Sequence, residues 1–514
     1  MRRATFAFVA ALVLAAPAAP GLVDIDNPPA GVFEDEWYAI MLNSRKSGHM
    51  HSTMERVRGP DGRDVIRTKT MMMMVAGRAE STLTVTSQQE TEETLDGRPL
   101  SFTNTMRLGA LPSVMKGTFR DGKVHISHQQ FGQQTVEQVY ELPPDAVMAW
   151  GAYREQIRRG LKPGTRYELK LYDAGVSPSR VTPALMEVLE RETIDLFGRK
   201  VEAVRTRQTL RLQGLLGAGS TIESDTWMTD AGTAVKLRMT MLNIPVELLA
   251  CTRSVALSKN DPAELMTQTL IEAGRRIDRH RASRLTCRLT WSGGKGRAAA
   301  AEIPETDMQR IVRRDAEGVV LEISRRSAAE PATRPATLPD DQRQRYLEAS
   351  VTLNHRDPKI RALAAEAVGD EKDPWRIADR LRRFVTDYVR TRDLSVGFAT
   401  ASEVARSREG DCTEHGVLLA ALGRAAGIPS RVVTGVLYVE EFAGREHVFG
   451  GHMWTQFWID DRWVDLDAAF RQTEVDPTHI ALGVSPAGDT GVADMVNSIW
   501  LNMDGLKIEI LDLQ

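Results

Sequence analysis

Three residues in the last quarter of the chain have the types that cysteine-dependent acyl transfer requires. Cys412 precedes an apolar run with helical periodicity, His452 lies in a run rich in aromatic residues, and Asp467 follows a second, shorter run over residues 462–466. A thiol attacks a carbonyl as its thiolate, so it needs a base, and the base in turn needs a group that orients it. The order Cys, His, Asp meets these needs but does not by itself identify a reaction.

The residues around Cys412 predict that it occupies the first position of a helix. Asp411 suits the N-cap position, residues 417–426 continue the helix, and Gly427-Ile428-Pro429 ends it. The backbone N–H groups and the dipole at a helix start favour a thiolate and could also bind an oxyanion. The sequence therefore predicts an activated thiol at Cys412.

The position of Asp467 relative to His452 follows from a predicted hairpin. If Asp460-Asp461 is a two-residue loop, residue 459 faces residue 462 and Trp454 faces Asp467. His452 and Trp454 share a face of their strand, which makes Asp467 a diagonal neighbour of His452 at roughly 7–8 Å or less. A slip of one residue would turn Asp467 to the other face, so its selection depends on this turn.

Other polar residues nearby receive different predictions. Asp465 lies on the same face as Asp467 but farther from His452, and Glu414 is expected to cap the helix or to support the site. His415 is a rival base one helical turn from Cys412, although a structural role is favoured because its side chain would point along the helix. His447 and His479 are expected in loops or at the surface.

Three motifs in this region resemble those of the transglutaminase-like superfamily. They are Gly410-Asp411-Cys412-x-Glu414, His452-x-Trp454 and Trp463-Val464-x-Leu466-Asp467, and the run Arg424-Ala425-Ala426-Gly427-Ile428-Pro429-Ser430-Arg431 is similar too. The resemblance covers about residues 350–485. It implies an α+β papain-like core with Cys412 as nucleophile, His452 as base and Asp467 as orienting acid. Many members have Pro after the Asp, whereas this chain has Ala468, which leaves the carboxylate intact.

The rest of the chain predicts a multidomain protein, with β-rich antiparallel sheets before the α+β papain-like transglutaminase core. Alternating runs and turns such as Asp96-Gly97 and Asp121-Gly122 predict a β-rich domain over residues 30–255. A smaller second β domain is expected over 256–327, a linker rich in Pro and Ala over 328–345, and the catalytic domain over 346–514. Within the last, helices are expected over residues 357–368 and 375–390.

Composition and the N-terminus constrain the setting of the protein. The chain of 514 residues has a net charge of −3, which gives no reason to expect nucleic acid or an acidic membrane surface as partner. Arg2 and Arg3, an apolar run over 6–15 and small residues up to 19 predict a signal peptide over 1–19, with an uncleaved membrane anchor as the alternative. No later run is long enough to span a membrane, so a periplasmic or extracellular protein is expected.

Neither a cofactor nor a metal is expected. No nucleotide-binding loop, dinucleotide fingerprint or calcium loop is evident, and a zinc site from Cys412, His415 and His452 lacks the usual ligand spacings. The two other cysteines, Cys251 and Cys287, could form a disulfide or remain buried thiols.

We therefore expect an exported thiol enzyme that acts on amide bonds of protein or peptide substrates through an acyl-enzyme. Hydrolysis is favoured over crosslinking, because bacterial members of the family it resembles are often viewed as proteases. The alternative is a non-catalytic binding or assembly module with a relic papain-like domain. That alternative would be favoured by a missing catalytic residue, and none of the three is missing.

Overall fold

The computed structural model describes residues 23–514 with the exception of 60, 79–80, 108–111, 130–134, 213–219, 242–243, 264–268, 293–302, 328–329, 331–336, 351, 391–398, 488–502 and 504. The signal peptide predicted over 1–19 and much of the linker predicted over 328–345 lie outside the described residues. The chain divides into two compact units, one mainly before and one mainly after residue 264.

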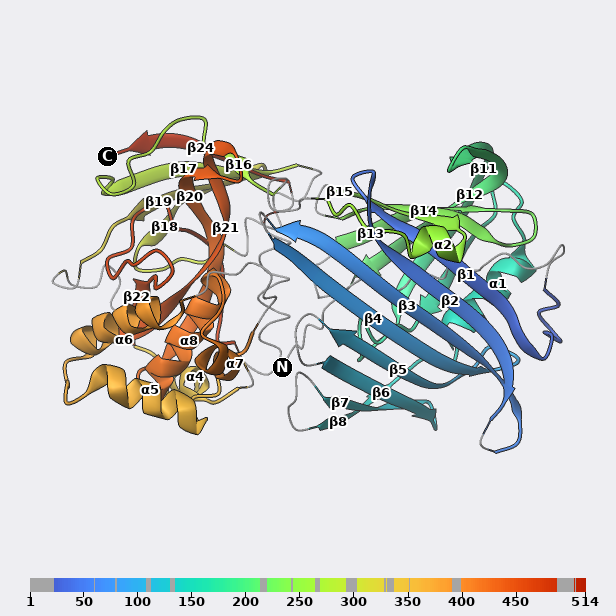
Figure 1. Cartoon of the computed structure of the whole chain (residues 1–514), viewed down its shortest axis with the longest axis horizontal. Helices are drawn as coiled ribbons and strands as arrows, with labels where there is room; N and C mark the ends of the chain where they lie inside the picture. The colour runs from blue at the N-terminus through green and yellow to red at the C-terminus, as the bar shows by residue number, and fades with distance from the viewer. Residues whose placement is uncertain are drawn as a thin grey trace. The chain divides into compact units, whose positions relative to one another are not determined.

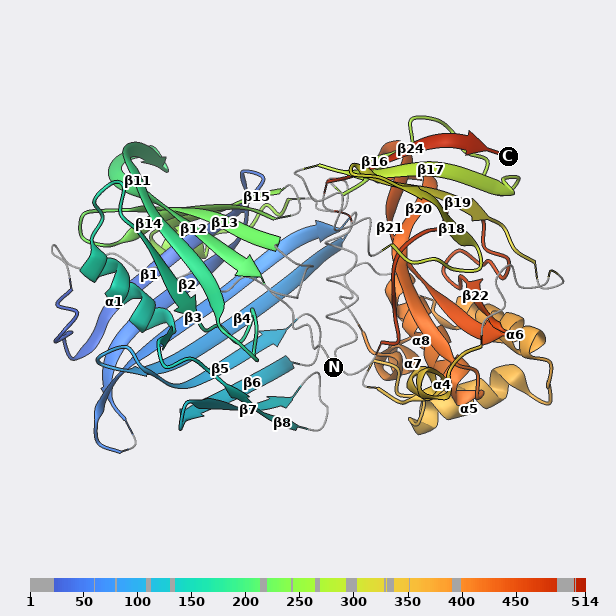
Figure 2. The same cartoon turned by 180° about the vertical axis from the view of Figure 1, so that it is seen from behind.

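The first unit is built on one large, strongly curved sheet (Figure 1 and Figure 2). Its strands follow one another in space as in the chain, from β8 to β1 and from β15 to β9, and β1 joins the two halves by pairing with β15. The strand bounds are β1 (Gly31–Leu42), β2 (Arg45–Arg58), β3 (Asp64–Arg78), β4 (Ser81–Thr94), β5 (Pro99–Arg107), β6 (Pro112–Arg120), β7 (Lys123–Gln129), β8 (Val136–Glu141), β9 (Ala146–Val147), β10 (Arg166–Leu171), β11 (Thr182–Leu196), β12 (Arg199–Leu212), β13 (Ser220–Met228), β14 (Ala234–Met241) and β15 (Ile244–Cys251).

Short connections between neighbours explain this order, because each two-residue turn returns the chain antiparallel to the strand it has just left. The predicted turn at Asp121-Gly122 joins β6 to β7, and both of its residues have positive φ, 52° and 69°. Asp96-Gly97 likewise lies between β4 and β5. Helices α1 (Ala149–Arg159) and α2 (Arg253–Ala256) complete the described elements of this unit. The prediction of a β-rich N-terminal region is confirmed.

The second unit contains two sheets and a group of helices. The helices are α4 (Asp340–Leu347), α5 (Pro358–Val368), α6 (Pro374–Tyr388), α7 (Ala401–Ser407) and α8 (Cys412–Ala425). One sheet has the order β16 (Ile271–Glu272), β21 (Arg445–Ile459), β20 (Ser430–Phe442), β23 (Ile480–Ser485), with β22 (Arg462–Leu466) also paired to β21. The other has the order β18 (Gln309–Arg314), β19 (Gly318–Ser324), β17 (Arg284–Trp291), β24 (Leu506–Leu513).

The sheet that contains β20 and β21 is buried on both faces. Helices α5 to α8 share one hydrophobic core with residues of β20, β21 and β22, such as Val432 and Phe457. The opposite face packs on the second sheet through residues such as Val436 and Phe449. Burial on both sides explains why Ser430 to Tyr438 are buried without interruption, as expected for a central strand.

Helix α8 lies close to β21 because glycines face that strand. A Cβ atom on Gly423 would lie 2.5 Å from the ring of Phe457, and one on Gly416 would lie 3.3 Å from Met453 Cγ. The Thr455 hydroxyl also donates to the backbone carbonyl of Gly416 over 2.9 Å. These contacts fix the helix that begins at Cys412 on the strand that carries His452.

The helix starts follow local capping chemistry. Asp357 caps α5 by accepting the Lys359 N–H at 2.9 Å, and Asp373 caps α6 by accepting the Arg376 N–H at 2.9 Å. Each cap is followed by Pro, which suits the first helical position. The two helices predicted over 357–368 and 375–390 are thus confirmed to within two residues at each end. None of the described helices combines the length and the apolar character needed to cross a membrane.

Candidate active site

Cys412 is the first residue of α8, as the sequence predicted, and a capping box holds this helix start. The carboxylate of Asp411 accepts the Thr413 N–H at 2.9 Å, and Glu414 Oε2 accepts the Asp411 N–H at 2.9 Å. Gly410 has φ +145°, and a Cβ there would lie 2.2 Å from the Glu414 side chain. Glycine before the cap therefore leaves the room that Glu414 occupies.

Glu414 is fully buried and supports the helix start rather than acting as an acid. Its Oε1 accepts the Ala399 N–H at 3.0 Å. Burial, together with the nearby charge of Asp411, raises the pKa of Glu414 well above its ordinary value. This shift disfavours the charged form of Glu414 beside Cys412. The predicted capping role is confirmed.

His415 also has a structural position, because its Nδ1 lies 2.6 Å from the backbone carbonyl of Asp411. The imidazole is buried and turned back along its own helix. This arrangement agrees with the structural role that the sequence favoured over a role as base.

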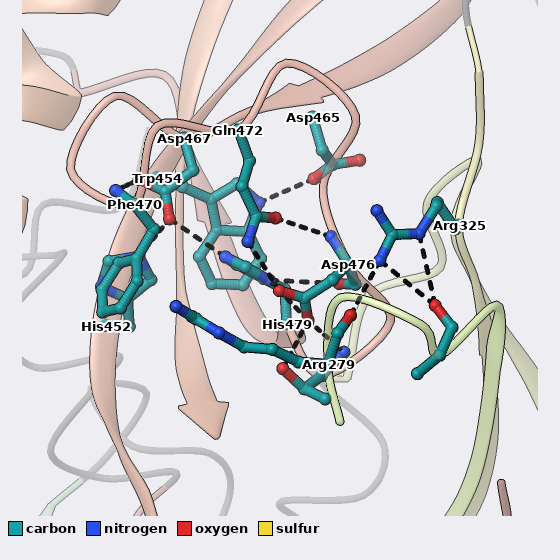
Figure 3. A network of polar contacts seen from close by, with 12 residues as sticks. Arg279, Arg325, His452, Trp454, Asp465, Asp467, Phe470, Gln472, Asp476 and His479 are labelled. Carbon is teal, nitrogen blue, oxygen red and sulfur yellow. Dashed lines mark hydrogen bonds and ion pairs between the residues drawn. The ribbon is translucent and has the colours of Figure 1, made fainter. Parts of the chain in front are cut away.

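The hairpin that selects Asp467 forms with the predicted register. Ile459 pairs with Arg462 and Thr455 with Leu466, so Trp454 and Asp467 come next in line. Asp460 and Asp461 form the turn with φ of 48° and 59°, a left-handed conformation that aspartate tolerates better than most residues. His452 Nε2 lies 2.7 Å from Asp467 Oδ2, and both side chains are nearly inaccessible, at 4% and 1% (Figure 3).

The charge of Asp467 fixes the protons of its partners. Burial alone would raise its pKa, but the charge and hydrogen bond of His452, with a further hydrogen bond from His479, hold the pKa well below its ordinary range. An ionised carboxylate only accepts hydrogen bonds, so Nε2 of His452 carries a proton. In the neutral imidazole of His452 the lone pair is then on Nδ1, the nitrogen that Asp467 does not bind.

His479 is a member of the site that the sequence analysis missed. His479 does lie in a loop, just before β23, but the expectation that it lies at the surface is wrong: it is 3% exposed, and its Nε2 lies 3.0 Å from Asp467 Oδ2. Its Nδ1 faces the backbone carbonyl of Asp476 at 3.1 Å, so both ring nitrogens must donate and the ring is an imidazolium. Burial alone would lower the pKa of His479, but Asp467 and Asp476 raise it to about 9.

His447 was also expected in a loop or at the surface, and this too is wrong. It lies in β21 and is half-buried, with Nδ1 3.0 Å from the Tyr438 hydroxyl. Its ring therefore contacts Tyr438, a residue of the core between the two sheets.

The imidazolium of His479 predicts a pH-dependent contribution to stability. A pKa of about 9 against about 6.5 in the unfolded chain gives a contribution of about 3 kcal/mol that is complete below pH 6.5 and lost as the pH rises through 9. His479→Gln should therefore lower the free energy of unfolding more at pH 6 than at pH 9.5. Urea unfolding at both pH values measures this difference. The exposed His280→Gln is the matched control, and an equal loss at both pH values would contradict the imidazolium.

A second buried network lies behind the first. Asp465 Oδ1 accepts the Trp454 indole N–H at 2.7 Å and the Gln456 amide at 2.8 Å, and Gln456 in turn accepts from Arg431 Nε at 2.7 Å. Trp454 stacks on His452 with 5.9 Å between ring centroids. Asp465 therefore positions Trp454 and Gln456, while Asp467 holds His452. Trp454 and Trp458 are both buried.

His452, Asp467 and His479 also offer ligand atoms within 4.8 Å of one another, which could hold a metal ion. The same atoms are joined here by hydrogen bonds of 2.7 and 3.0 Å, and a metal would have to displace both protons. The set differs from the Cys412, His415 and His452 combination considered from sequence. Hydrogen bonding accounts for this cluster without a metal.

All three cysteines are free thiols, so Cys251 and Cys287 are not bonded to each other. Burial raises the pKa of Cys287 to about 12, and burial also raises the pKa of Cys251. These shifts disfavour the reactive thiolate form of both cysteines near neutral pH. Cys412 differs from them in its place at a helix start, packed at the edge of the helical core.

Residues 361–468 match the family model of the transglutaminase-like superfamily. The C-terminal part of the chain thus contains a transglutaminase-like domain, and the matched segment includes Cys412, His452 and Asp467. The resemblance seen in the sequence motifs is confirmed.

Comparison with other proteins adds distant likenesses. No curated protein matches this chain. Among solved structures, a putative cysteine protease from Cytophaga hutchinsonii is similar with 14% identity and a TM-score of 0.29, covering 45% of this chain and 86% of that one. A beta-barrel-like protein with a domain of unknown function from Brucella abortus is similar with 12% identity and a TM-score of 0.30, covering 42% and 95%. A putative protease from Parabacteroides distasonis has 10% identity and a TM-score of 0.20, covering 75% and 68%.

Proposed function

We propose that the transglutaminase-like domain is a papain-like catalytic domain, and that the protein is an exported thiol enzyme. It hydrolyses amide bonds of protein or peptide substrates through an acyl-enzyme on Cys412. His452 is the base and Asp467 the acid that orients it. Export rests on the predicted signal peptide over residues 1–19.

The observation that supports this proposal is the hydrogen bond of 2.7 Å between His452 and Asp467. His452 lies on β21, and β21 contacts the helix that begins at Cys412. It leaves Nδ1 of His452 as the basic nitrogen, which is the atom required to take the thiol proton. The Asp467 carboxylate stabilises the imidazolium that results. The constellation thus supplies a nucleophile, a base and an orienting acid from adjacent elements.

The reaction proceeds in two balanced steps. The Cys412 thiolate attacks the amide carbon, and His452 gives its proton to the amide nitrogen. The C–N bond then breaks, the amine departs, and the acyl group remains on Cys412 as a thioester. Water then attacks the thioester while His452 takes a proton, and the C–S bond breaks to restore the thiolate. We propose water rather than an amine as the usual acceptor, because transfer to an amine requires a second substrate to be bound.

The test is the rate at which iodoacetamide alkylates Cys412 as a function of pH, followed by peptide mass spectrometry. In the wild type we expect rapid labelling well below pH 8.5, near which an ordinary thiol ionises. In His452→Gln the labelling should move to the pH range of an ordinary thiol, because the partner that takes the proton is gone. Cys287, whose pKa is about 12, is the internal control.

Slow labelling of Cys412 in the wild type, unchanged by His452→Gln, would contradict the proposal. The non-catalytic binding module would then be the better description of the chain. Far-ultraviolet circular dichroism verifies that the His452→Gln variant is folded, because the near-ultraviolet signal of Trp454 would change with the loss of the ring on which it stacks.

A further inference from the structure

A guanidinium group lies against an aromatic ring that contacts the proposed catalytic histidine. The central carbon of the Arg279 guanidinium is 4.8 Å from the ring centroid of Phe470. Phe470 in turn meets His452 edge-on, with 5.1 Å between ring centroids and an interplanar angle of 88°. Figure 3 shows the Arg279 side chain extending towards these two rings. Phe470 therefore links a positive charge to the ring that would serve as base.

The backbone that carries Arg279 is held in place from its other side. Arg325 donates to the carbonyl oxygens of Arg279, His280 and Ala282, at 2.8, 3.3 and 3.2 Å. Ile277, two residues earlier, is buried in the core between the sheets. Arg325 thus fixes the backbone turn that carries Arg279, and this pre-organises the Arg279 side chain.

The charge of Arg279 is not matched within the described part of the chain. Its Nη1 is buried and has no hydrogen-bond partner there. Arg279 as a whole is half-buried, and the fully buried arginines of this unit are engaged: Arg424 Nη2 donates to the Ser430 carbonyl at 2.9 Å, and Arg431 Nε to Gln456 at 2.7 Å. A buried donor without a partner is costly, and a charged one more so. The Arg279 guanidinium, near the proposed catalytic histidine, is therefore suited to donate a hydrogen bond to an oxygen atom of a ligand.

We propose that Arg279 binds the carboxylate of an acidic peptide substrate close to the amide bond that Cys412 attacks. A guanidinium presents paired N–H donors that match the two oxygens of a carboxylate, and Phe470 supports its face. This inference rests on the proposed function and narrows it to substrates with an acidic group near the scissile bond. Arg279 is then a specificity-determining residue that comes from outside the segment matching the family model.

The test compares two alkylating reagents of similar size, the anion iodoacetate and the neutral iodoacetamide. Their rate ratio at Cys412 is divided by the same ratio for N-acetylcysteine, which removes intrinsic reactivity. In the wild type the normalised ratio should exceed one, because the cation attracts the anionic reagent. Arg279→Gln should lower it by about three- to tenfold, a range expected for loss of one nearby charge in a partly solvated site. Arg279→Lys should retain part of the preference.

The matched control is Arg281→Gln, which removes the same charge from an exposed position two residues away. A normalised ratio that stays unchanged in Arg279→Gln, with rapid labelling by both reagents, would overturn the role of Arg279 and leave the proposed function standing. A normalised ratio that falls as much in Arg281→Gln as in Arg279→Gln would assign the effect to net charge, and it would also overturn the role of Arg279. Slow labelling of Cys412 by both reagents in the wild type would overturn the proposed function and this inference together.

Discussion

Replacement of Cys412 by alanine should reduce amide hydrolysis by at least about 10³-fold. The reason is that no other described thiol lies on the helix start that faces β21, while the thiols of Cys251 and Cys287 have raised pKa values. Cleavage of a peptide library, followed by mass spectrometry, measures the loss. The wild type should also yield a covalent adduct on Cys412 when the reaction is quenched in acid.

The control for this prediction is Cys251→Ala, which removes a half-buried thiol at the end of β15 and should leave cleavage unchanged. Addition of methylamine distinguishes the two fates of the acyl-enzyme, since transfer adds the amine to the product and hydrolysis does not. Cleavage that persists in Cys412→Ala would rule out an acyl-enzyme on this residue.

The second large effect is expected for Asp467→Asn. Asp467 accepts from His452 and His479 through one oxygen and from the Phe470 N–H at 2.9 Å through the other. Asparagine is neutral and cannot replace the carboxylate that accepts hydrogen bonds from both imidazoles. His452 then loses its fixed tautomer, and turnover should fall by about 10³- to 10⁴-fold. The parallel with the Asp→Asn substitution in serine proteases sets this magnitude.

The same substitution should lower the free energy of unfolding by about 3–5 kcal/mol at neutral pH, because it leaves the buried His479 imidazolium without its anion. The pKa of Asp467 is depressed in the folded state, so its contribution is complete above about pH 4 and is lost as the pH falls through the folded value. The difference between wild type and variant should therefore shrink below pH 4. Urea unfolding at pH 3 and at pH 6 measures this change.

Asp465→Asn is the matched control, because Asp465 is also buried and lies two residues earlier in the chain. An asparagine there can still accept from Trp454 and Gln456, so the loss of activity should be much smaller. A larger loss from Asp465→Asn than from Asp467→Asn would assign the orienting role to Asp465 instead.

Local chemistry explains why much of the site could be predicted from the sequence. The helix at Cys412 begins where Asp411 and Glu414 form a capping box. The groups that form this capping box lie within three residues of one another in the sequence. The approach of Asp467 to His452 follows from a two-residue turn, whose register then fixes every pair along the hairpin. In both cases the interacting residues are near in sequence, so spacing alone carries the information.

His479 could not be placed in the same way. It reaches Asp467 because β23 pairs with β20, and that pairing brings together residues about fifty positions apart. The local sequence around His479 predicts only a turn, which Asp476 and Thr478 do form. A turn can lie at the surface or against a core, and only the packing of the sheet decides between them.

The sequence by itself determined the nature of the candidate site: a cysteine at a helix start, a histidine and an aspartate on one hairpin, and a β-rich region before them. The tertiary structure alone decided what surrounds that site. The segment expected as a separate small β domain shares a sheet with β24 from the end of the chain, and it also supplies Arg279 beside Phe470. Such contacts join residues more than a hundred positions apart, and they depend on how buried faces pack, because apolar patterns specify that a face is buried but not which face covers it.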